Sequence, residues 1–186
     1  KEANADNPDN LSVIGRMEGE ALFLRAYCYA KLVTTYGGVP LLDKPVKLGE
    51  DITHIQRSSF EESVNFIVSD CDNAATSLWS KEATEMGRAN NAAALALKSR
   101  ILLFAASDLT ADGTVNNKLI AYGNPDRQLL WTKARDAARA IMDLGTYHLA
   151  DLSGNNVTEI ANNYYDLFKQ KDLSNVEVIW GKMFRQ

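Results

Sequence analysis

The chain has 186 residues, enough for one domain with a substantial hydrophobic core or for two small ones. Hydrophobic residues make up 46% and charged residues 24% of the sequence, ordinary proportions that exclude a wholly disordered, collagen-like or coiled-coil chain. The net charge of −4 argues against a nucleic-acid partner, because a general nucleic-acid binder needs a basic surface. Two cysteines are too few for a disulfide scaffold or a zinc site built from sulfur ligands alone.

Residues 1–11 are polar and are expected to form a loose arm before a single domain that spans residues 12–186. The first strong periodic signal predicts a helix from about Ser12 to Tyr36. Two neighbouring apolar stripes run along this helix, so we expect other helices to cover it on two sides. The stripes consist of Met17, Ala21, Leu24, Cys28, Leu32 and Thr35, and of Phe23, Tyr27 and Ala30.

The second predicted helix begins at Ser58 or Ser59, because each serine offers a capping box with the glutamate three residues later. It ends near Trp79, and its apolar positions indicate one buried face. The preceding segment, Val39–Val46, contains two prolines and is predicted to run extended along the helices.

A third helix is predicted from Asn90 or Asn91 to about Ser107. Its core is apolar around almost its whole circumference, which is typical of a central, buried helix and argues against an open groove beside it. A fourth helix is predicted from Asp126 to near Leu144.

The tail is less regular, with a short helix predicted at Ala161–Phe168. Val176–Phe184 alternates and is rich in β-branched residues, so it is interpreted as a strand. The predicted fold is all-α, with long connecting loops and a short C-terminal strand.

An internal repeat supports this interpretation. At an offset of 75 residues Ala21-Leu22 matches Ala96-Leu97, and Arg25 matches Arg100. The second and fourth helices align at an offset of 74. Two helical hairpins stacked in the tetratricopeptide manner would bury one continuous core.

Arg25 and Arg100 have no acidic residue one helical turn away. Each guanidinium must therefore find a partner across the fold or extend outward to solvent. A structural ion pair is the preferred interpretation over an anion-binding site, because buried arginines are usually paired.

Residues 19–42, GEALFLRAYCYAKLVTTYGGVPLL, resemble the SusD/RagB family. The similarity lies in an acid–Ala pair, Leu-Arg-Ala, clustered aromatics, Leu-Val, Tyr-Gly and Val-Pro-Leu. AALALKSRILLFAAS (93–107), WTKARDAARAIMDLGTYHL (131–149) and YYDLFKQKDLSNVEVIW (164–180) are similar to later parts of the family pattern, in the same order.

The resemblance implies an all-helical, non-catalytic lipoprotein on the surface of the cell outer membrane. Such a protein captures an oligosaccharide or another nutrient and delivers it to a SusC-like TonB-dependent transporter. The family's lipidated cysteine has no counterpart here, since Cys28 and Cys71 lie within predicted helices. Family members are also more than twice this length, so the chain is interpreted as a scaffold fragment.

No enzyme motif accompanies His54 and His148, so no catalytic residue and no cofactor are expected. Residues 108–119 follow the first part of a calcium loop, which makes Asp108 and Asp112 candidate ligands. Leu119 stands where that loop needs a glutamate, so a polar connector is preferred to a metal site.

Glycan binding needs flat aromatic side chains beside hydrogen-bonding groups. Trp79, Tyr164 and Tyr165 are the candidates, although packing is the preferred role for each, as it is for Trp131. Two alternatives to nutrient capture remain open: a tetratricopeptide-like protein-interaction scaffold without a small-molecule ligand, and a helical hydrolase.

Overall fold

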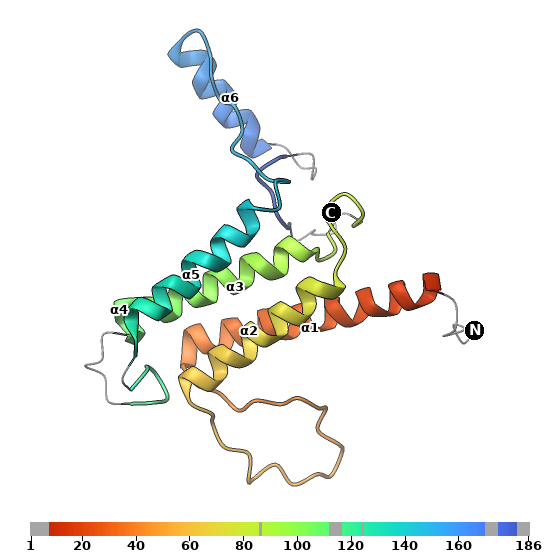
Figure 1. Cartoon of the computed structure of the whole chain (residues 1–186), viewed down its shortest axis with the longest axis vertical. Helices are drawn as coiled ribbons and strands as arrows, with labels where there is room; N and C mark the ends of the chain where they lie inside the picture. Colours follow the sequence, from red (N-terminus) through yellow and green to blue (C-terminus); the bar gives the residue numbers. More distant parts are fainter. Residues whose placement is uncertain (1–7, 86, 112–116, 124, 170–174, 182–186) are drawn as a thin grey trace.

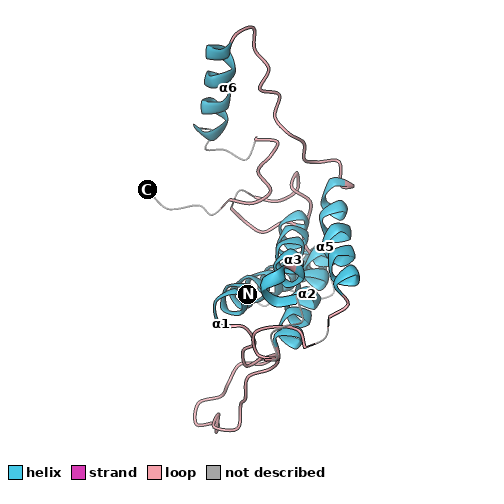
Figure 2. Cartoon of the chain, turned by 90° about the vertical axis from the view of Figure 1, so that its left-hand side faces the viewer, coloured by secondary structure: helices cyan, strands magenta, loops and turns pink. Residues whose placement is uncertain are grey.

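The computed structural model describes residues 8–85, 87–111, 117–123, 125–169 and 175–181. The longer helices up to residue 142 lie side by side in a stack, and the last helix, at residues 157–169, projects away from it (Figures 1 and 2). The elements are α1 (Pro8–Tyr36), α2 (Phe60–Ser77), α3 (Asn91–Ala106), the single turn α4 (Asp108–Ala111), α5 (Arg127–Met142) and α6 (Val157–Lys169). The predicted all-α fold is therefore confirmed.

The helix starts predicted from capping residues are confirmed. The Ser59 hydroxyl accepts from the Glu62 N–H, and the Glu62 carboxylate accepts from the Ser59 N–H, which is a complete capping box. Asn90 caps α3 and Asp126 caps α5 through their side-chain oxygens. These starts depend on neighbouring residues alone, which is why the sequence predicts them well.

The helices pair as two hairpins. α1 packs on α2, α3 packs on α5, and α2 joins the two hairpins by packing on α3 (Figure 1). This is the tetratricopeptide-like arrangement predicted from the internal repeat. The connectors are long, and the loop between α1 and α2 extends below the stack (Figure 1).

The main core lies where α1, α2 and α3 meet. Small side chains let these helices approach closely, and larger ones fill the space between them. Its buried members include Ala26, Ala30, Val33, Phe60, Val64, Ile67, Cys71, Ile101 and Ala105.

One of the two apolar stripes of α1 packs against the other helices, and the other faces solvent. Phe23 and Ala30 are buried. The first stripe, which was expected to be covered as well, faces solvent: Met17 is 58% and Leu24 53% exposed, and Cys28 is also exposed. Periodicity shows that α1 has two apolar faces, but the neighbouring helices occupy only one of them.

The prediction of a strand at Val176–Phe184 is wrong for the part that the structure describes. Residues 175–181 form a turn, a bend and irregular backbone, held by side chains of the α2–α3 loop rather than by a second strand. Residues 182–184 of that prediction lie outside the described residues. At the other end, α1 begins at Pro8, four residues before the expected Ser12.

Arg25 forms the structural ion pair that was preferred from the sequence. Its Nε and Nη2 donate to the two carboxylate oxygens of Asp70 on α2, each at 2.7 Å, and its Nη1 donates to the Asp43 carbonyl at 3.3 Å. The Asp70 side chain is only 4% exposed. This hydrogen bonding raises the pKa of Arg25, so its guanidinium stays charged.

Breaking this pair is expected to destabilise the fold. Arg25→Met should lower the free energy of unfolding by about 2–3 kcal/mol, because it leaves the Asp70 carboxylate buried without a partner. Arg25→Met combined with Asp70→Leu should recover part of this loss. Urea denaturation of the three proteins measures the effect.

Arg135→Gln is the matched control, since Arg135 pairs with its exposed neighbour Asp136 and should change stability by no more than about 0.5 kcal/mol. Equal losses for Arg25→Met and Arg135→Gln would contradict the role of the buried pair.

The two cysteines are free thiols with opposite exposure. Burial raises the pKa of Cys71 to about 12, with Asp72 and Asp70 adding to the shift. Near pH 8 the native protein should therefore react with a disulfide reagent at one thiol, and at a second only after unfolding. Cys28→Ser should abolish the native reaction, whereas two fast thiols, or none, would contradict this arrangement.

Candidate functional site

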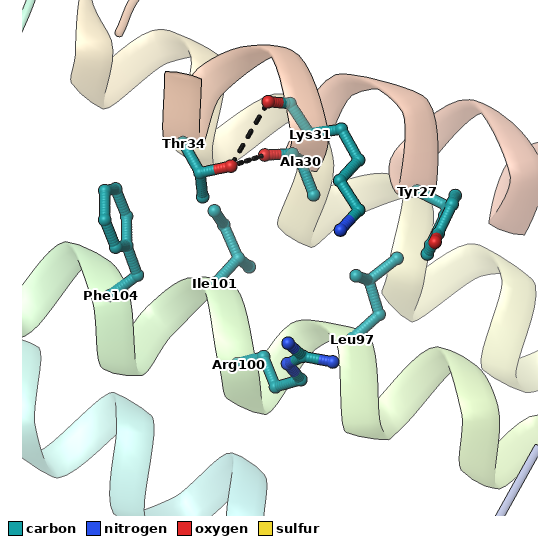
Figure 3. A pocket seen from close by; sticks show the side chains of 8 residues that line it. All are labelled: Tyr27, Ala30, Lys31, Thr34, Leu97, Arg100, Ile101 and Phe104. Atoms are coloured by element: carbon teal, nitrogen blue, oxygen red, sulfur yellow. Dashed lines mark hydrogen bonds between the residues drawn. The ribbon is translucent and has the colours of Figure 1, made fainter. Parts of the chain in front are cut away.

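Two adjoining cavities lie along the line where α1 passes α3. The smaller has a volume of about 220 Å³ and is walled by these two helices alone (Figure 3). The larger, of about 490 Å³, is closed on one side by residues 177–180. Tyr27, Leu97 and Arg100 line both. Together they form one site, which we call the α1–α3 groove, and the expectation of no open groove beside the third helix is wrong.

The smaller cavity combines an apolar wall with two cations. Lys31 and Arg100 project from facing helices into the space between them, and the Lys31 ammonium lies 5.7 Å from the ring centre of Tyr27 (Figure 3). The apolar wall consists of Ala30, Leu97, Ile101 and Phe104. None of the described residues that line this cavity is acidic.

Aromatic side chains build the larger cavity. Trp180 packs edge-on against Phe23 and Tyr27, with ring centres 5.2 and 5.9 Å apart. The Trp180 indole N–H donates to the Gly87 carbonyl at 3.2 Å. Glu177 is exposed and lines the same cavity, and its carboxylate accepts a hydrogen bond from the Ala150 N–H. The groove therefore offers apolar ring faces beside polar groups.

The loop before α3 fixes the position of residues 175–181. Asn90 is buried; its side-chain oxygen caps α3, and its side-chain nitrogen donates to the Ile179 carbonyl at 3.0 Å. The Lys81 ammonium donates to the carbonyls of Asn175 and Val178, both at 3.0 Å. One asparagine thus connects the start of α3 to the segment that carries Trp180.

The two repeat-related arginines have different surroundings. Arg25 is fully engaged by Asp70 and Asp43, as described above. Arg100 is exposed and makes no hydrogen bond or ion pair with any residue that the structure describes. It adopts the outward orientation that the sequence left open as the alternative to a structural pair, and it points into the groove.

The three glycan-binding candidates are not brought together. Trp79 is half-buried beneath the Arg16 guanidinium, which lies 4.2 Å from its ring centre, so it packs against that side chain. Tyr164 and Tyr165 lie on α6 and are 57% and 60% exposed, against the packing expected for them. Trp131, expected in the core, is 42% exposed on α5.

The metal candidates and the histidines form no site that the structure describes. Asp108 begins α4 and pairs with Arg127, while Asp112 lies outside the described residues. Among the described residues, no group of three metal-ligating side chains is present. His54 and His148 are both exposed, in different loops.

The sequence reasoning missed Lys31 and Trp180 as groove residues. Trp180 was assigned to a strand, and Lys31 was not singled out. Two signals for the groove were available: Tyr27 stands in the second apolar stripe of the first helix, and Arg100 has no acidic residue one helical turn away.

Comparison with known proteins now identifies the fold. A family model described as starch-binding and associating with the outer membrane matches residues 1–103. That match covers more than half of the chain. The chain belongs to this SusD-like family. The matched region includes α1, α2 and most of α3, and so contains most of the helical wall of the groove but not residues 177–180.

Solved structures agree with the family assignment. A SusD-like protein from Bacteroides fragilis is 27% identical over 94% of this chain and 28% of that protein, with a TM-score of 0.69. A SusD-like carbohydrate-binding protein from the same species is 27% identical over 73% and 22% of the two chains, with a TM-score of 0.55. The structure of BT4246 matches 98% of this chain and 37% of its own, at 20% identity and a TM-score of 0.74, and supports the fold.

The SusD-like chain therefore spans less than two-fifths of the length of these structures. No curated protein sequence matches it. None of the helices in the described part of the chain is both long and apolar enough to cross a membrane.

The double role of Asn90 can be separated by two substitutions. Asn90→Ala should cost about 2 kcal/mol of stability, because it removes both the cap and the bond to Ile179. Asn90→Ser should keep the cap and cost about half as much, because serine is too short to reach Ile179. Both variants should shift the Trp180 indole N–H signal in nitrogen-edited NMR spectra. An unshifted Trp180 signal in both variants would contradict this coupling.

Proposed function

We propose that this SusD-like chain is the helical scaffold of a non-catalytic protein that captures carbohydrate at the outer-membrane surface. The observation that carries the proposal is the family match over residues 1–103, whose description names starch binding and the outer membrane. The α1–α3 groove, with aromatic and hydrogen-bonding side chains, is the part of this chain that suits a sugar.

In this proposal the captured oligosaccharide is passed to a SusC-like TonB-dependent transporter, and a lipid anchor outside this chain holds the protein at the membrane. We also propose that the chain is part of a longer protein. Two observations support this: the related structures are much longer, and one apolar face of α1 has no cover among the described residues. Such a face is expected where further polypeptide or a partner packs.

Calorimetry with a neutral oligosaccharide tests the capture function. Maltohexaose should bind the 186-residue chain, and Trp180→Ala should weaken binding about five-fold or more, because it removes an aromatic wall of the larger cavity. Trp180→Phe, which retains a ring, should weaken it less. Circular dichroism checks that each variant is folded.

Trp131→Ala is the matched control, since Trp131 is an exposed tryptophan on α5 that lines neither cavity of the groove. Equal losses for the two tryptophan-to-alanine variants would place the sugar elsewhere. Binding of a peptide without any oligosaccharide would favour the protein-interaction scaffold instead.

A further inference from the structure

Packing of the helices does not explain why Arg100 and Lys31 carry their charges into the groove. The repeat-related Arg25 is paired, since its Nε and Nη2 donate to the two carboxylate oxygens of Asp70. At the offset that aligns the second and fourth helices, the position equivalent to Asp70 is Leu144. The second hairpin therefore has the arginine without the carboxylate.

The orientation of Arg100 leaves its guanidinium available to bind a ligand. Its guanidinium and the Lys31 ammonium both point into the smaller cavity, from α3 and α1 (Figure 3). Two like charges that share an apolar-walled space repel each other, and an anion between them would remove that repulsion. A guanidinium binds a carboxylate through two parallel hydrogen bonds, as Arg25 does here.

The other lining groups indicate what carries the anion. Leu97, Ile101 and the Tyr27 ring offer an apolar surface, and the Tyr27 hydroxyl is a hydrogen-bonding group beside it. A sugar ring presents an apolar C–H face and polar edges, so it suits this mixed wall. The larger cavity continues from the same three shared residues and gives space for neighbouring sugars.

We propose that the α1–α3 groove binds an acidic oligosaccharide, with one uronate carboxylate held between Arg100 and Lys31. This inference rests on the proposed capture function and narrows its substrate class. Glu177, the acidic residue that lines the larger cavity, would oppose a second carboxylate there. The geometry thus favours a single charged sugar in the smaller cavity and neutral sugars or hydroxyl groups beside Glu177.

The test compares charged and uncharged forms of one ligand by calorimetry. Tetramers of galacturonate and of glucuronate are titrated into the 186-residue chain, beside their methyl esters, which keep the shape and lose the charge. At least one acid should bind about ten-fold or more tightly than its ester. Arg100→Gln should remove about ten- to one-hundred-fold of that affinity, and Lys31→Gln about three- to ten-fold.

Arg135→Gln is the matched control, because it removes one exposed arginine charge away from the groove and should leave the affinity unchanged. Nitrogen-edited spectra locate the ligand, since the indole N–H of Trp180 borders the groove and should shift with the acid. Circular dichroism confirms that each variant is folded.

The outcomes separate this inference from the capture function. Binding of maltohexaose with no preference for either acid overturns the inference and leaves carbohydrate capture standing. An acid that binds equally well to the wild type and to Arg100→Gln also overturns it. If neither neutral nor acidic oligosaccharides bind, both proposals fail.

Discussion

Helix α3 is apolar around almost its whole circumference, and the arrangement of the other helices follows from the need to cover it. Ala94, Ile101 and Ala105 are buried by α2 and α1, while Leu102 packs against Ala134 and Ala137 of α5. A helix that is apolar all round is stable in water only when neighbours surround it. Among the described residues, the side of α3 that carries Leu97, Arg100 and the exposed Leu103 lacks close cover, and Leu97 and Arg100 line the groove.

The two hairpins share one packing arrangement but differ in the partner of the repeat-related arginine. In the first hairpin the arginine is neutralised inside the fold by Asp70, and the pair fixes α1 to α2. In the second hairpin the matching arginine is exposed, and Leu144 takes the place of the acid. The repeat thus preserves the packing of the helices, whereas the arginine of each hairpin can have a different role, in packing or in binding.

Sequence reasoning succeeded where the cause was local. Ser59, Asn90 and Asp126 cap helices through contacts only a few residues away, so their neighbours determine the outcome. Sequence reasoning failed for α1, which has two neighbouring apolar faces, of which the other helices cover one. Nothing in the spacing of Met17 and Leu24 shows that they would remain exposed, because burial depends on which face the other helices approach.

The groove could not be predicted from the sequence because it, too, depends on how distant parts of the chain pack together. Its walls come from α1, from α3 and from residues 177–180, which lie far apart in the sequence. Trp180 reaches it because Asn90 holds the Ile179 carbonyl with the same side chain that begins α3. The folding of α3 and the closing of the larger cavity are therefore coupled. A protein that builds its site in this way has no binding pocket until its scaffold has formed, so the helices and the candidate site depend on the same few contacts.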